Sequence, residues 1–250
     1  SDLLLALLNA VLQPLSPIAA IDVLNSEPEK ATPGDKDVVL DLRLRLDSGE
    51  QIDVEMQCRW HPALPERLLF YWARMHAGQL GQGADYTELR RSLVIVFADF
   101  RLLGSQRFHS VFQARERHTQ QLLTDQLEVH VLELPKLESA SDRNDEPELV
   151  RWCRFLAATT DAELDELAME SPTLKQAKEA LEELSQDPPA RFGAEQRELS
   201  RITYDLVMHA TRAEGKAEGL AEGLLAVLAA RGIAVSHEQA AAIRSSQDLL

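Results

Sequence analysis

The sequence predicts an α/β protein: a core with a central mixed β-sheet flanked by helices, followed by an all-helical C-terminal region. Residues 38–59 alternate between apolar and polar side chains on either side of a turn, which is typical of a β-hairpin. Residues 93–98 are continuously apolar, as expected of a central parallel strand covered on both faces. After residue 147 the apolar residues recur at helical spacing. Strands interleaved with helices, and then helices alone, predict this order of layers.

The same patterns predict three regions along the 250 residues. Residues 1–138 are expected to form the core, and the polar residues 139–146 begin a helical region that extends to residue 210. Residues 211–250 are expected to form a helix rich in Gly, Ala and Glu and a short C-terminal helical tail. Helices are predicted over residues 2–13, 65–80, 148–158, 161–169, 173–184 and 195–210, and further strands over 21–24, 108–113 and 127–134.

The turn of the hairpin predicts its register. A three-residue loop over 47–49, with Gly49 in the left-handed region, is a common hairpin connection. The loop would pair Leu46 with Glu50, Arg43 with Asp53, and Asp41 with Glu55. Directly opposed side chains share a face about 4.5–5.5 Å apart, so two opposed carboxylates repel unless a positive charge lies between them.

Two kinds of positive charge are available to such a carboxylate pair. A hard divalent cation such as Mg²⁺ takes oxygen ligands from one or two carboxylates and from substrate phosphates. Alternatively, Arg43 and Arg45 neutralise the acids on an ordinary solvated face. The charge pattern alone favours the solvated face.

The helix predicted over residues 65–80 has two stripes. Leu68, Trp72, Met75 and Gln79 form the stripe that we expect to face the core. Arg67, Tyr71, Arg74 and Gly78 form the second, which would present two guanidinium groups to a phosphate backbone. Lys36, in the polar loop before the hairpin, could also reach a phosphate, although a solvated loop lysine is the commoner case.

Three Ala-Glu-Gly triplets, at 213–215, 217–219 and 221–223, put glycine at every fourth position of a predicted helix. Each glycine costs about 1 kcal/mol relative to alanine in a helix, so the repeat needs a reason. Close helix–helix approach, within the chain or in a homo-oligomer formed through the C-terminal helices, is one; a flexible hinge is the other. Gly232 and Ser236 are expected to end this helix and begin the next.

Asp41 followed by Glu55-Met56-Gln57 resembles the D…ExK motif of the PD-(D/E)XK nuclease superfamily, with Gln57 in place of the lysine. More narrowly, the chain resembles the Rpn family of recombination-promoting nucleases, a transposase-like branch. The resemblance covers most of residues 1 to about 230, and we expect an earlier stretch of the family domain to be missing or to lie upstream. Other positions that carry the resemblance are Asp35-Lys36, Val39-Leu40, Arg67, Tyr71, Gln79-Leu80, Gly83, Tyr86, Leu123-Thr124-Asp125, Leu127-Glu128-Val129-His130 and Glu133-Leu134.

The resemblance implies an αβββαβ core and a Mg²⁺-dependent DNA endonuclease, with Mn²⁺ as a candidate substitute ion. Asp41 and Glu55 would hold the metal, and Gln57 would take part in catalysis by orienting the attacking water through hydrogen bonds, without the charge of a lysine. The implied DNA contacts come from Lys36, Arg67, Tyr71 and Arg74, and the implied role is DNA recombination or transposition-like exchange. The alternative is a catalytically inactive nuclease fold that serves as a DNA- or protein-binding assembly module.

Charge and composition bear on both alternatives. The net charge of −15 disfavours DNA binding, yet residues 59–117 hold nine arginines against five acidic residues. Two distant cysteines fit a reducing cytoplasm, and no apolar run reaches the roughly 18–20 residues that span a bilayer. The sequence has no phosphate-binding glycine loop and no GxSxG elbow, its histidines have no metal-ligand spacing, and nothing near Cys58 marks an activated thiolate. It therefore does not predict a kinase, dinucleotide enzyme, serine hydrolase or cysteine enzyme.

Overall fold

The computed structural model describes residues 2–24, 42–139, 147–188, 216, 219–236, 239–240 and 243. The chain divides into two compact units, residues 1–179 and 180–250, which are taken separately below. The domain boundaries predicted at residues 138 and 210 stay predictions. Lys36, Asp41 and the helix predicted over 195–210 lie outside the described residues.

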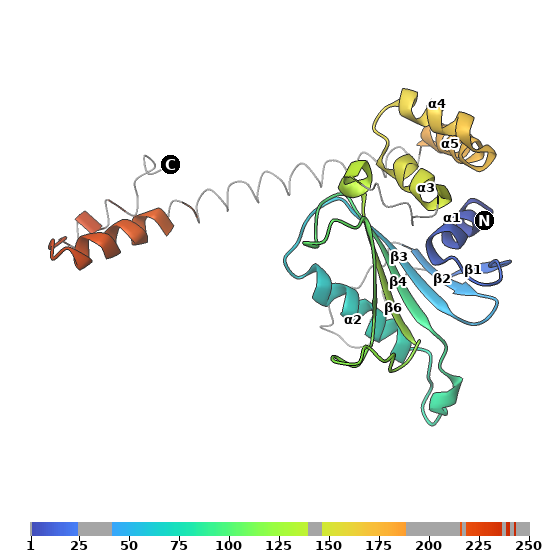
Figure 1. Ribbon diagram of the computed structural model, residues 1–250, viewed down its shortest axis with the longest axis horizontal. Coiled ribbons are helices and arrows are strands. Elements are labelled where there is room, and N and C mark those ends of the chain that lie inside the picture. The colour runs from blue at the N-terminus through green and yellow to red at the C-terminus, as the bar shows by residue number, and fades with distance from the viewer. Residues whose placement is uncertain are drawn as a thin grey trace. The chain divides into compact units, whose positions relative to one another are not determined.

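A six-stranded mixed sheet in the order β1-β2-β3-β4-β6-β5 forms the centre of the first unit (Figure 1). Strands β3, β4 and β6 are parallel to one another, whereas β1, β2 and β5 are antiparallel to their neighbours. This arrangement confirms the predicted α/β fold with a mixed sheet. The strands are β1 (Ile21–Leu24), β2 (Leu42–Leu46), β3 (Gln51–Gln57), β4 (Ser92–Ala98), β5 (His109–Gln113) and β6 (Leu127–Glu133).

Strand β4 is buried along its whole length, as its apolar sequence predicts. It pairs with parallel strands on both sides, and its side chains point alternately to the two faces of the sheet. Leu93, Ile95 and Phe97 join one hydrophobic cluster, and Val94 and Val96 join the other.

Helices cover each face of the sheet (Figure 1). Helices α1 (Asp2–Leu12) and α3 (Pro147–Ala157) pack on the face of Leu93 and Ile95, and α2 (Leu64–Ala77) packs on the face of Val94 and Val96. Helices α4 (Asp161–Glu170) and α5 (Pro172–Gln186) follow α3, and short 3₁₀ turns occupy Tyr86–Glu88 and Leu134–Ser139.

Most predicted elements differ from the observed ones by one to three residues at an end, and three of these differences have a visible cause. Helix α2 ends at Ala77 rather than residue 80, because the Gly78 N–H caps the Arg74 carbonyl and the Gln79 side chain turns to β4. Strand β5 begins at His109 rather than Phe108, whose side chain is buried in the core. Strand β6 ends at Glu133, because Leu134 already begins the 3₁₀ turn.

The hairpin of β2 and β3 has the predicted register. Gly49 has a φ of +88°, and the Leu46 N–H donates to the Glu50 carbonyl at 2.9 Å. Arg43 lies opposite Asp53, as expected. The turn and the alternation of side chains together therefore determined the register.

The described residues of the second unit include a helix over 219–230. Gly232, with a φ of +70°, ends it, and Ser236 Oγ accepts a hydrogen bond from Gln239 N at 3.2 Å, so both predicted caps are confirmed. Among the described residues, no atom lies within 4 Å of a Cβ built at Gly219 or Gly223, so these two glycines do not serve close packing there. No described helix is both long enough and apolar enough to cross a bilayer.

Candidate active site

Two buried carboxylates and an amide follow one another along a single face of β3. Asp53 and Glu55 are 0% and 1% exposed and lie beside Val94 and Val96 of β4, so they face α2, and the alternation of the strand puts Gln57 on the same face. A buried carboxylate is costly unless polar groups or a cation compensate it. This face of β3 is therefore the place to look for chemistry.

Gln57 contacts Glu55 directly. Its Nε2 atom donates a hydrogen bond to Glu55 Oε2 at 2.9 Å. Gln57 is half-buried at the last position of β3, where the Asp99 N–H donates to the Gln57 carbonyl at 2.9 Å. The pair thus lies at the carboxyl end of parallel strands, where open α/β sheets bind their ligands.

The arginines of β2 do not pair with Glu55. Arg43 Nη2 donates to Gln51 Oε1 at 2.8 Å, and Arg45 Nη2 donates to Asp22 Oδ2 at 3.0 Å. These contacts argue against neutralisation of Glu55 by the hairpin arginines. The described register ends with Leu42 opposite Val54, and Asp41, the next residue, lies outside the described residues.

The donor set available on β3 suits a hard cation. Asp53 and Glu55 offer carboxylate oxygens, and in the described part of the chain no three His, Cys, Asp or Glu side chains converge as metal ligands. Mg²⁺ commonly uses one or two carboxylates and completes its shell with water and phosphate. The residues present fit that ion better than zinc, which favours three or four protein ligands of nitrogen or sulfur.

A second buried charge lies at the same end of the sheet, and the sequence analysis did not single it out. Register places Gln57, Ala98 and Glu133 side by side across β3, β4 and β6. Glu133 is 0% exposed and accepts a hydrogen bond from the N–H of Leu103 at 3.0 Å. The Glu-Leu-Pro-Lys sequence, with opposite charges three residues apart, was the available signal.

Lys136 is the partner of Glu133. Its Nζ atom donates to Glu133 Oε2, to the Leu103 carbonyl at 2.9 Å and to the Ser105 carbonyl at 2.7 Å. An ammonium group has three hydrogens, so these contacts use all of them. Lys136 therefore anchors the loop after β4 and does not supply the lysine that Gln57 replaces.

Helix α2 brings two of the predicted DNA-binding residues together. Arg67 donates from Nε and Nη2 to Tyr71 Oη at 3.3 and 3.1 Å. Tyr71 is buried, with 9% of its surface exposed. Arg74 instead lies over Phe70, its Cζ 5.9 Å from the ring centroid. Contact of Arg67, Tyr71 and Arg74 with DNA stays a prediction.

The other flank of α2 is fastened to the start of β4. Trp72 Nε1 donates to the Ser92 carbonyl at 2.9 Å, and Gln79 Nε2 donates to Ser92 Oγ at 2.8 Å. His76 Nδ1 lies 3.0 Å from Ser92 Oγ, and burial lowers the pKa of His76. The contacts confirm that Trp72 and Gln79 belong to the packed side of the helix.

A row of polar side chains crosses β6 on the face of the sheet that lies away from α2. Arg91 Nη2 donates to Glu128 Oε2 at 2.8 Å, Glu128 lies 3.4 Å from His130 Nε2, and His130 Nδ1 lies 3.0 Å from His109 Nε2. The hydrogen bond with His130 is the main cause that lowers the pKa of Glu128. Burial, followed by the charge of His130, lowers the pKa of His109 to about 4. His130 is buried in this row.

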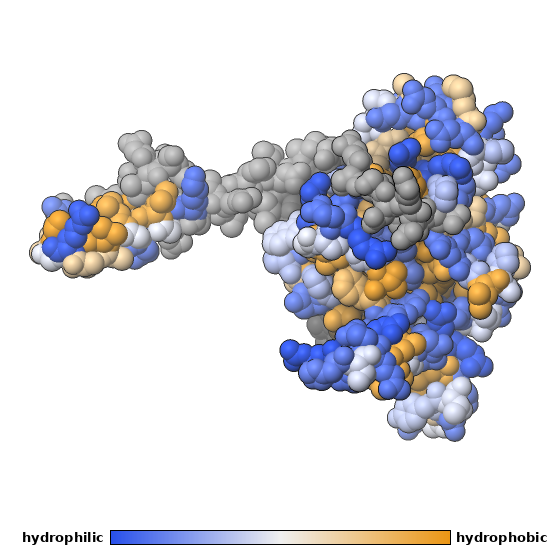
Figure 2. All heavy atoms as spheres, in the orientation of Figure 1, coloured by the Kyte–Doolittle hydropathy of each residue, from blue (hydrophilic) through white to orange (hydrophobic). Residues whose placement is uncertain are grey.

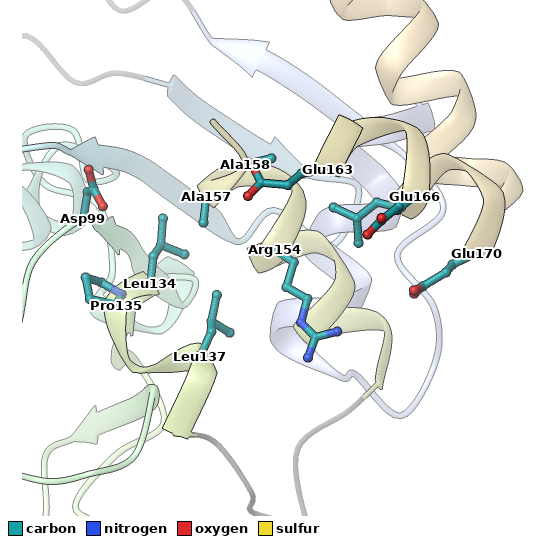
Figure 3. A pocket seen from close by; sticks show the side chains of 11 residues that line it. Asp99, Leu134, Pro135, Leu137, Arg154, Ala157, Ala158, Glu163, Glu166 and Glu170 are labelled. Atoms are coloured by element: carbon teal, nitrogen blue, oxygen red, sulfur yellow. The ribbon is translucent and has the colours of Figure 1, made fainter. Parts of the chain in front are cut away.

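A cavity of about 570 Å³ lies between the Leu134–Ser139 turn and helices α3 and α4 (Figure 3). Its apolar wall includes Leu134, Leu137 and Leu167, which belong to the cluster beneath α1 and α3. Glu55 faces α2, on the other face of the sheet from that cluster. Asp99, whose N–H donates to the Gln57 carbonyl, also lines the cavity, so the cavity lies at the same end of the sheet as the candidate active site.

The fold and the acidic end of β3 define a nuclease-like α/β protein. The family model for the PD-(D/E)XK nuclease family transposase matches residues 1–210, and the chain belongs to that family. The match confirms the resemblance found in the sequence. No curated protein and no solved structure gave a significant match.

Proposed function

We propose that this member of the PD-(D/E)XK nuclease family is a Mg²⁺-dependent endonuclease that hydrolyses phosphodiester bonds in DNA. One observation carries the proposal: Glu55, 1% exposed, is held by Gln57 at the carboxyl end of a parallel strand. A carboxylate is kept in so buried a place at a cost, and a functional role explains why it is kept.

Asp41 and Glu55 are the proposed metal ligands. The register of β2 and β3, with Leu42 opposite Val54, supports the pairing of the next two positions, 41 and 55. Asp53 shares the face of Glu55 and is a further candidate donor. A divalent ion bound there would acidify a water molecule and neutralise charge on the scissile phosphate.

Gln57 is the proposed orienting residue for the attacking water. Its amide nitrogen carries two hydrogens, and one of them is used on Glu55. The second can hold a water molecule beside the carboxylate. Because an amide adds no positive charge, we expect slower cleavage than a lysine would support.

The wider role follows from the family. We propose that cleavage promotes DNA recombination or transposition-like exchange, that the protein works in the cytoplasm, and that Mn²⁺ can replace Mg²⁺. A homo-oligomer formed through the C-terminal helices stays part of this proposal. The nine arginines of residues 59–117, against five acids, supply the positive region that DNA requires.

Nicking of supercoiled plasmid with Mg²⁺ tests the proposal, with EDTA as the first control. Asp41→Asn and Glu55→Gln should each lower cleavage by at least about a hundredfold, because each removes a negative oxygen ligand. Glu66→Gln, an exposed acid on α2, is the matched control and should cleave as the wild type does. Nicking that survives Glu55→Gln would show that the proposed site is wrong.

A catalytically inactive assembly module is the second candidate. One observation favours it: Gln57 stands in the lysine position, and all three hydrogens of Lys136 are used elsewhere. An inactive fold should bind DNA or another protein without Mg²⁺-dependent nicking. Its Asp41→Asn and Glu55→Gln variants should be as stable as the wild type or more stable, because they relieve repulsion between carboxylates.

A further inference from the structure

Two aromatic side chains in the segment that follows β3, the loop and helix α2, are exposed to solvent. Trp60 lies three residues after Gln57 and is 54% exposed, and Phe70 on α2 is 48% exposed. Figure 2 shows hydrophobic side chains at the surface in the part of the view where Figure 1 draws α2. Large aromatic rings at a surface that also carries arginine are typical of single-stranded nucleic-acid sites.

Helical geometry places Phe70 on the flank of α2 that lies toward β3. Residues 67, 70, 71 and 74 follow the i, i+3, i+4, i+7 spacing of one helix flank. The opposite flank bears Trp72, which donates a hydrogen bond to the Ser92 carbonyl and packs against the hydrophobic cluster shared by α2, β4 and β6. Since α2 contacts both β3 and β4, and Trp72 on the opposite flank bonds the first residue of β4, we infer that the flank of Phe70 lies toward β3.

The two arginines of this flank are held in place by aromatic rings. Tyr71 Oη accepts hydrogen bonds from Nε and Nη2 of Arg67, whose Cζ lies 5.5 Å from the tyrosine ring centroid. The contact leaves Nη1 of Arg67 for a phosphate oxygen. Arg74 lies over Phe70, and the Tyr71 ring is tilted against the same ring with the centroids 6.3 Å apart. Phe70 is still 48% exposed, so positive charge and exposed aromatic surface occur side by side on α2.

We propose that Phe70 and Trp60 stack with unpaired bases of a DNA strand while Arg67 and Arg74 contact its phosphates. The proposal deepens the proposed nuclease function and depends on it for the identity of the ligand. Base pairs in a duplex hide their ring faces in the stack, so these two rings favour single-stranded or locally opened DNA. The positive charge of this flank complements a phosphate backbone, and the two exposed aromatic rings favour a ligand with unpaired bases over an acidic protein surface.

Binding to oligonucleotides in EDTA tests this surface apart from cleavage. The probes are a fluorescein-labelled 20-mer of mixed sequence and the blunt duplex made from it, measured by anisotropy with the full chain. The wild type should bind the single strand more tightly than the duplex. Phe70→Ala and Trp60→Ala should each weaken single-strand binding at least about fivefold, since one stacked base is lost. Phe70→Tyr, which keeps an aromatic ring, should retain the affinity.

Phe112→Ala is the matched control, because Phe112 on the edge strand β5 is 47% exposed and should not affect binding. Tryptophan fluorescence gives a second readout: the single strand should quench the wild type, and Trp60→Ala should abolish the quench, since Trp152 is buried and Trp72 is bonded to Ser92. The proposal would be wrong if the wild type bound the single strand and the duplex equally and both alanine variants kept the wild-type affinity.

The outcomes separate the two proposals. If the alanine variants lose single-strand binding and the wild type does not nick plasmid, the proposed DNA-binding surface stands and the proposed nuclease activity is rejected. If Glu55→Gln loses nicking while Phe70→Ala and Trp60→Ala bind DNA as the wild type does, the proposed nuclease activity stands and the proposed DNA-binding surface is rejected.

Discussion

The side chain of Gln57 donates a hydrogen bond to the carboxylate of Glu55 across 2.9 Å, on one face of β3. Glu55 occupies the metal-ligand position of the nuclease motif and Gln57 occupies the lysine position, so the residues at these two positions are in direct contact. Gln57 stands at the lysine position of the motif and donates a hydrogen bond to the carboxylate, but it carries no charge. The first two predictions concern this pair.

Gln57→Lys should raise the rate of plasmid nicking by about tenfold, which corresponds to about 1.4 kcal/mol of the barrier. The ammonium group would keep the contact with Glu55 and add a positive charge near the water and the phosphate. Initial rates at saturating Mg²⁺ measure the effect, with Gln57→Met as a control of similar size that lacks hydrogen bonds. A Lys variant no faster than the Met variant would show that charge at this position is not what limits cleavage.

Glu55→Gln should remove the stabilisation that Mg²⁺ gives the folded protein. A ligand at ten times its Kd stabilises the native state by about 1.4 kcal/mol, which raises the Tm by about 3–6 °C for a domain of this size. The wild type should show this rise and Glu55→Gln should not, because a neutral amide binds a hard cation poorly. Thermal unfolding with and without 10 mM Mg²⁺ measures it. Glu66→Gln should keep the full rise, and a Glu55→Gln variant that also keeps it would place the metal elsewhere.

Lys136→Met should destabilise the fold by about 3–5 kcal/mol, because it leaves the fully buried Glu133 without its cation. Urea unfolding at neutral pH measures the free energy of unfolding. The control is Arg45→Met, whose ion pair with Asp22 is 50% and 67% exposed and should contribute less than about 1 kcal/mol. Equal losses in the two variants would show that burial of the Glu133–Lys136 pair has no energetic consequence.

Acid should destabilise the protein through His109. Its pKa in the folded state is about 4, whereas the ordinary value is 6.5, so between these pH values the unfolded chain binds more protons than the folded one. The free energy of unfolding should therefore fall by about 3 kcal/mol from pH 7 to pH 4 on account of this group. His109→Gln should flatten that part of the curve in urea unfolding at several pH values. A variant with the same acid sensitivity as the wild type would assign the effect to other groups.

Much of the sheet could be predicted from the sequence, because its signals are local. Residues 93–98 are apolar without interruption, and they form a strand covered on both faces. The glycine turn of the hairpin set Arg43 opposite Asp53, since a turn of fixed length leaves one register. The alternation of side chains along a strand also placed Asp53 and Glu55 on one face. Alternation alone does not show how deeply the two carboxylates are buried.

By itself, the sequence determined the strands, the hairpin register and the family, because period, turn chemistry and motif spacing are properties of neighbouring residues. Only the tertiary structure decided that Lys136 is engaged with Glu133 and the Ser105 carbonyl, and that Arg67 is bound to a buried Tyr71. The packing also decided that Phe70 is exposed while Trp72 bonds Ser92. Lys136 and Glu133 are three positions apart and Arg67 and Tyr71 are four apart, so local spacing permits both pairs. Their burial, and a contact such as that of Lys136 with the Ser105 carbonyl 31 positions away, depend on which elements meet in space.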